Sequence, residues 1–394
     1  MSRFTITVVA TALIAPTSGT PLAGQAAPAT WSLSPEPLLR IGATTGAEEY
    51  LFQTITGIVR LPGDRLAVAD DGFLTIRVYD RSGQYLYQMG RHGDGPGEFQ
   101  SIDGLWLTDA GELAVWDSDL RRITRFTQAG ILVESKPIVG DREIGNLQPA
   151  FGPMADGQVL LGALTTGPTR TGESPTHPYL LRRYNLSGEF RGSVGQAEGM
   201  WRYEWGDGSN TPLPFTPLPW VATWHDTVYV AAGYDPEIEV RDRSGAVLRT
   251  LTVPGARAAT RKDWAEMERV LRARANDLSA GAFYVGRLER RDMPFDDRMP
   301  GVAGLLLDDA GLVWVKAFEP ARDARWLRRR TRPPAPGGKW VVLDPTSGVV
   351  VATVEMPSSL VPLVIGDTEI IGMDEDSLGV ERVVIHKLRR GKTP

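Results

Sequence analysis

The segment Phe52–Ile58 (FQTITGI) is followed 47 positions later by the segment Phe99–Leu105 (FQSIDGL). The same offset relates further pairs of similar residues: Leu66–Val68 and Leu113–Val115, Asp70 and Asp117, Ile76 and Ile123, Tyr79 and Phe126, and Gly83 and Gly130. An offset that holds over this length indicates an internal repeat. A period of roughly 40 to 50 residues is typical of β-propeller blades.

Other parts of the chain carry weaker copies of the repeat. Asp80–Gly83 (DRSG) recurs as Asp242–Gly245, and Asp109–Gly111 (DAG) recurs as Asp309–Gly311. Within a copy, apolar residues alternate along short segments, which is the two-residue period of a β-strand, and glycines mark the turns. A four-stranded unit of this kind cannot bury its own faces, so the copies must stack around an axis.

The copies predict an all-β fold, a six-bladed propeller of four-stranded antiparallel blades in a single domain over residues 31–390. The sixth copy has only three strands. Its outer strand is expected from Pro37–Gly42, which precedes Phe52 as Tyr85–Gly90 precedes Phe99, so that the N-terminal strand closes the ring. The expected blades are residues 43–90, 99–139, 147–195, 214–255, 299–356 and 360–388 with 37–42.

A family resemblance supports this fold. The segments Gly90–Phe99 and Gly111–Asp117, followed by Arg122, Ile123 and Phe126, resemble the NHL repeat. The resemblance implies a six-bladed NHL-like propeller of the kind common in bacterial secreted proteins. Propellers of this type include lactonases, lyases and binding platforms, so the resemblance implies a fold without a reaction.

The N-terminus and the composition limit the location and the partners. Residues 1–26 have one early arginine, an apolar run and small residues before Ala27, which predicts a cleavable signal peptide and a secreted or periplasmic protein. No later apolar segment is long enough for a membrane anchor. The chain has no cysteine and a net charge of −5, which argues against disulfides and against nucleic acid as a partner. We expect a monomer.

Four long insertions are expected on one face of the ring: residues 162–177, 195–214, 257–300 and 318–339. Insertion on one side is typical of a binding face, whereas drift in tolerant loops would affect both faces. The third insertion contains a predicted helix at about 260–278, which begins with the capping pair Thr260 and Asp263. Its apolar stripe either packs on the rim of the propeller or makes the helix a lid over the central channel.

Candidate ligand-binding residues lie mainly in these insertions. Trp201, Tyr203 and Trp205 form either a stacking platform or an ordinary outer strand. Arg325, Arg328 and Arg329 belong to an arginine cluster. This cluster either binds a carboxylate or phosphate ligand, forms a solvated loop, or pairs with the acidic run that begins at Asp374. The remaining candidates on this face are His92, Asp235, Glu237 and Asp374.

Evidence for catalysis is weaker. Glu49, Asp71 and Asp119 are candidate oxygen ligands for Ca²⁺ near the axis, but no cofactor is expected. Asp70 and Asp117 share one repeat position, which favours a structural role. We therefore favour a non-catalytic propeller that binds a protein, glycan or small ligand. The alternative is a calcium-assisted hydrolase or lyase of the lactonase or lyase type, with its site at the axial mouth.

Overall fold

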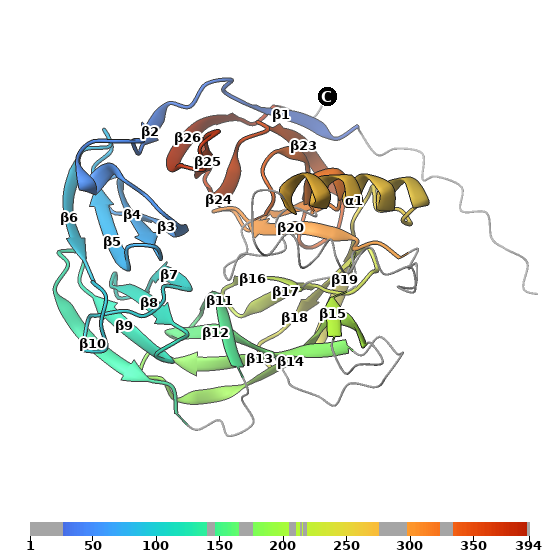
Figure 1. Cartoon of the computed structure of the whole chain (residues 1–394). Coiled ribbons are helices and arrows are strands. Elements are labelled where there is room, and N and C mark those ends of the chain that lie inside the picture. The colour runs from blue at the N-terminus through green and yellow to red at the C-terminus, as the bar shows by residue number, and fades with distance from the viewer. Residues whose placement is uncertain are drawn as a thin grey trace, which may run out of the picture.

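The computed structural model describes residues 27–139, 146–164, 176–204, 210–212, 215, 219–275, 298–323 and 334–391. Its sheets are arranged around a central axis, and the chain passes around the ring from the blue N-terminal strands to the red C-terminal blade (Figure 1). The expected all-β propeller of four-stranded antiparallel blades is confirmed. Residues 1–26, where the signal peptide is predicted, lie outside the described part of the chain.

The first three blades follow the repeat in chain order. Blade 1 consists of β3 to β6, with bounds Ile55–Leu61, Arg65–Asp70, Thr75–Tyr79 and Tyr85–Met89. Blade 2 consists of β7 to β10, with bounds Gly104–Leu107, Leu113–Asp117, Arg122–Phe126 and Leu132–Pro137. Blade 3 consists of β11 to β15, with bounds Asn146–Met154, Gln158–Leu164, Thr176–Asn185, Phe190–Glu204 and Asn210–Pro212.

The other three blades follow in the second half of the chain, and an N-terminal strand completes blade 6. Blade 4 consists of β16 to β19, with bounds Trp220–Trp224, Thr227–Ala231, Glu237–Arg241 and Val247–Thr252. Blade 5 consists of β20 to β23, with bounds Val302–Leu307, Val313–Ala317, Gly338–Leu343 and Val350–Met356. Blade 6 consists of β24 to β26 and β2, with bounds Val361–Ile365, Glu369–Glu375, Glu381–Arg389 and Leu39–Ile41. The helices are the 3-10 helix η1 (Glu48–Tyr50), α1 (Arg261–Ala275) and α3 (Pro320–Asp323).

The repeated residues have repeated structural roles. Asp80 and Asp242 occupy equivalent hairpin turns, and each carboxylate accepts hydrogen bonds from the amides two and four residues later, at 2.8 to 3.1 Å. The glycines of these turns, Gly83 and Gly245, have φ values of 83° and 92°, which a residue with a Cβ rarely adopts. The same sequence therefore folds into the same turn in blades 1 and 4.

The expected closure of the ring is confirmed. β2 pairs antiparallel with β26, so that Leu39 faces Ile385 and Ile41 faces Val383. The sequence analysis did not predict a further strand, β1 (Ala29–Leu33), which pairs parallel with β23 and antiparallel with the end of β26. Because β1 joins blades 5 and 6 into one nine-stranded sheet, the N-terminal segment closes the ring at two places.

Two expectations need correction. The connection after blade 3 was expected to begin at residue 195, but β14 continues to Glu204 and pairs with β15 through Tyr203 and Thr211. The single predicted helix corresponds to α1, which begins at Arg261, yet the described residues also contain η1 and α3. Residues 276–278 lie outside the described part of the chain. No described helix has the length and apolar character needed to cross a membrane.

Candidate functional site

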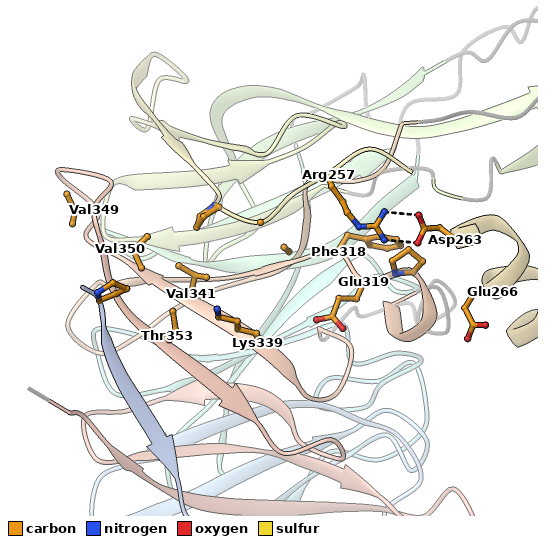
Figure 2. Close-up of a pocket in the computed structure, with 15 residues that line it drawn as sticks. Arg257, Asp263, Glu266, Phe318, Glu319, Lys339, Val341, Val349, Val350 and Thr353 are labelled. Atoms are coloured by element: carbon orange, nitrogen blue, oxygen red, sulfur yellow. Dashed lines mark hydrogen bonds and ion pairs between the residues drawn. The ribbon is translucent and has the colours of Figure 1, made fainter. Parts of the chain in front are cut away.

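A cleft of about 790 Å³ lies between blades 4 and 5 beside the beginning of α1 (Figure 2). One wall is the face of β22 and β23 that carries Val341 and its cross-strand neighbour Thr353. Pro254 and Gly255, which follow the outer strand of blade 4 after Val253, also line the cleft. Its volume lies in the range of roughly 300 to 1,000 Å³ that is usual for small-molecule sites.

The cleft exists because blade 4 ends earlier than blade 5 on this side. Leu251 and Val253 still pack against Val315 and Leu343 in the core between the two blades. Beyond them, Gly255 has a φ of 91° at the turn, and a Cβ built there would have no neighbour within 4 Å. Among the described residues, Val341 and Val350 of blade 5 therefore line the cleft beyond the last strand of blade 4.

The beginning of α1 forms one end of the cleft and is held by the predicted capping pair. The Asp263 carboxylate accepts a hydrogen bond from the Thr260 amide at 2.8 Å, and the Asp263 amide donates to the Thr260 hydroxyl at 3.3 Å. The Arg257 guanidinium binds both Asp263 oxygens, at 2.6 and 2.7 Å. These hydrogen bonds, of which those from Arg257 have the largest effect, hold the pKa of Asp263 well below its usual range. Figure 2 shows this ion pair beside the cleft.

An aromatic cluster holds α1 against the propeller. Met267 and Met299 are buried together with Phe215, and the partly buried Trp264 and Phe318 pack on them. The Phe215 ring meets the rings of Trp264 and Phe318 edge to face, with centroids 5.9 and 6.0 Å apart. The cluster joins residues of the third and fourth predicted insertions with Phe215, which directly follows the second. Trp264 and Met267 of α1 take part in this docking, which agrees with a helix that packs on the rim of the propeller.

A buried ion pair fixes the wall formed by α3. Lys316, in β21, is completely buried, and its ammonium group lies 2.5 Å from a carboxylate oxygen of Asp323. The second oxygen of Asp323 accepts the Glu319 amide at 2.6 Å. Burial raises the pKa of Asp323, and the Lys316 charge opposes this effect. The pair ties α3 to β21, and Phe318 and Glu319 between them line the cleft.

The sequence analysis missed this pair. It assigned no role to Asp323, whereas the carboxylate of this residue is buried. A signal was present at Lys316, which interrupts the apolar strand Val313–Ala317 and therefore requires a buried partner. The partner itself lies in an insertion, where no repeat indicates its position.

Several predicted binding residues lie outside the described part of the chain or are described only in their backbone. Trp205, Arg325, Arg328 and Arg329 are outside it. Trp201 and Tyr203 lie on β14, which matches the alternative of an outer strand. Their role in binding stays a prediction.

The other binding candidates do not gather in the cleft. His92 is exposed and forms a parallel bridge with Phe99 in the glycine-rich connection between blades 1 and 2. Asp235 and Glu237 are exposed at the beginning of β18. Asp374 is buried at the end of β25 and forms an ion pair with Arg40 of β2 at 3.0 Å. Asp376 of the same acidic run pairs with Arg382, so these two carboxylates are neutralised within blade 6.

The metal candidates occupy three different connections. Glu49 is half-buried in η1, Asp71 accepts the Ile102 amide at 2.7 Å, and Asp119 is exposed after β8. Within the described ranges, no three histidine or carboxylate side chains are grouped to hold a metal ion. Asp70 and Asp117 have the structural role expected of a repeat position: each accepts the amide of the equivalent glutamine, Gln53 or Gln100, at 3.1 and 2.8 Å.

Comparisons with known proteins agree with this architecture. A model of the DUF5128 family, described as a 6-bladed beta-propeller, matches residues 44–135, which span blade 1 and most of blade 2. The match supports the six-bladed ring, although the description does not name NHL repeats. No curated protein sequence matches the chain.

Solved structures that resemble this chain share little of its sequence. One is a DUF4221 family member from Bacteroides vulgatus, with a TM-score of 0.50 and 9% identity over 92% of this chain and 99% of that one. A Bacteroides fragilis protein named as exported has a TM-score of 0.49 and 11% identity over 93% and 97% of the two chains. Virginiamycin B lyase from Staphylococcus aureus has a TM-score of 0.43 and 12% identity over 91% and 99%. At these identities the likeness concerns the fold alone, and the chain is a β-propeller with six blades.

Proposed function

We propose that this protein is an extracytoplasmic, non-catalytic propeller that binds a ligand in the cleft between blades 4 and 5. The single observation that carries the proposal is a cleft whose walls are fixed in advance by the protein's own ion pairs. Arg257 and Asp263 hold one end, and Lys316 and Asp323 hold the wall at α3. Preformed walls lower the ordering cost of binding.

The composition of the cleft supports binding of a small ligand. Its lining combines valines and a phenylalanine with a few charged side chains at the edge, as is usual for ligand sites. The described carboxylates of the cleft, Asp263, Glu266 and Glu319, each lie beside an arginine. A positive charge beside a carboxylate lowers its basicity, so these groups are poor candidates for a general base. The location outside the cytoplasm rests on the signal-like residues 1–26.

The test compares two tryptophan substitutions on outer strands. Val350→Trp places an indole in the cleft, whereas Leu248→Trp places one on β19 at a side chain that is 52% exposed and does not line the cleft. A library of organic acids, sugars and short peptides is screened by thermal shift against the wild-type protein and both variants. We expect compounds that stabilise the wild type to stabilise Leu248→Trp equally and to lose their effect on Val350→Trp. Compounds that stabilise all three proteins equally would contradict binding in this cleft.

A further inference from the structure

The charged side chains of the cleft differ in whether a described side chain of opposite charge lies beside them. Arg257 is engaged by both oxygens of Asp263, and Glu266 binds Arg269 at 2.6 Å. The Glu319 carboxylate lies 3.8 Å from the Arg322 guanidinium. Each of these lining charges is therefore balanced by an opposite charge of the same insertion.

Lys339 is the exception among the described residues that line the cleft. It is exposed on β22, and no described carboxylate lies within ion-pair distance of its ammonium group. Its cross-strand neighbour Glu355 is also exposed and makes no such contact. Figure 2 shows the Lys339 side chain between the valines of blade 5 and Glu319. Among the described residues that line the cleft, Lys339 is therefore the one positive charge without a described carboxylate within ion-pair distance.

Apolar surface lies next to this charge. Val341 is the next residue of β22 on the same face, and Val350 belongs to the adjacent strand. Val349, at the outer end of the cleft, remains 37% exposed. An apolar group placed along these valines would be removed from water together with them, which favours binding.

We propose that the ligand of this cleft is a small organic monocarboxylate with an apolar body. The carboxylate pairs with the Lys339 ammonium group, and the body lies along Val341, Val349 and Val350. One free cation balances one negative charge, so a monoanion fits better than a phosphate dianion. This inference rests on the proposed function, because it names the class of ligand for the same cleft.

Octanoate is the probe, and octylamine, which has the same chain and the opposite charge, is its control. Both are titrated calorimetrically into the full-length protein below their micellar concentrations. We expect octanoate to bind at least about tenfold more tightly than octylamine, because the amine meets the Lys339 charge. Lys339→Met should weaken octanoate by about three- to tenfold, as for the loss of a partly exposed ion pair. Lys339→Glu should reverse the preference.

Lys262→Glu is the matched control variant. Lys262 is exposed on the first turn of α1 and does not line the cleft, so the substitution changes the net charge equally and should leave the preference for octanoate unchanged. Equal binding of octanoate and octylamine, no binding of octanoate, or the same affinity in Lys339→Glu would overturn the inference. If octanoate fails while other compounds still lose binding in Val350→Trp, the ligand class is wrong and the cleft remains a binding site. If Val350→Trp changes nothing, the proposed function fails as well.

Discussion

Blades 1 and 5 each bury a cation beside a carboxylate, but the two pairs hold different parts of the molecule. In blade 1, Arg77 and Asp70 are almost completely buried and lie 3.5 Å apart. Asp70 also accepts the amides of Gln53 and Thr54, which begin the blade. Asp70 occupies a repeat position, and its hydrogen bonds hold the segment that leads into blade 1.

In blade 5, Lys316 and Asp323 lie 2.5 Å apart, and the carboxylate comes from an insertion. The pair holds α3 and the residues of the cleft wall rather than the connection between two blades. A buried ion pair therefore stabilises a blade of the ring where its carboxylate is at a repeat position, as in blade 1. It stabilises the wall of the cleft where its carboxylate is in an insertion, as in blade 5. We therefore expect the two pairs to differ in how far the effect of their loss spreads.

The largest effect is expected for Asp70→Ala. The substitution leaves the Arg77 guanidinium buried without its carboxylate and removes the acceptor of several backbone amides, so the free energy of unfolding should fall by about 3–5 kcal/mol. Urea denaturation measures this change in the free energy of unfolding. Asp117→Ala is the matched control: the position equivalent to Arg77 in blade 2 is Thr124, so no buried cation is left behind and the loss should be smaller. An equal loss in both variants would show that the ion pair adds nothing to the backbone hydrogen bonds.

Lys316→Met should cost about 3 kcal/mol, because it leaves Asp323 buried without a counter-charge. The loss should be local: hydrogen exchange is expected to increase in α3 and in the strands beside the cleft, with blades 1 and 2 unaffected. The double variant Lys316→Met with Asp323→Leu should recover most of the stability, since it removes both charges. Equal loss of protection in every blade would contradict a pair that serves only the insertion.

Asp263→Asn should have the smallest effect, about 0.5–1 kcal/mol, because its ion pair with Arg257 is partly exposed. The pKa of Asp263 is lowered in the folded protein, so its contribution is fully present above the unfolded value of about 4 and is lost as the pH falls through the folded value. The wild type should therefore lose more stability than the variant between about pH 5 and pH 2. Thermal unfolding across this range measures the difference, and parallel curves for the two proteins would contradict it.

The sequence by itself determined the ring. The offset of 47 residues, the DRSG turns and the strand missing from the sixth copy predicted the blades and the closure by β2, because strand period and turn chemistry are local properties of the chain. The same repeat assigned Asp70 and Asp117 to structure. The capping pair of α1 could also be read from the sequence, since its two residues are three positions apart.

Only the tertiary structure decided the cleft. Phe215, Trp264 and Phe318 come from three segments that are far apart in the sequence, and their contact depends on how the closed ring brings those segments together. Lys316 and Asp323 are close in sequence, yet their pairing depends on the fold of an insertion that no other blade repeats. No described carboxylate lies within ion-pair distance of Lys339, which is likewise a result of where the fold places these side chains. Repetition encodes the scaffold locally, whereas a site made from unrepeated segments is defined only when those segments meet.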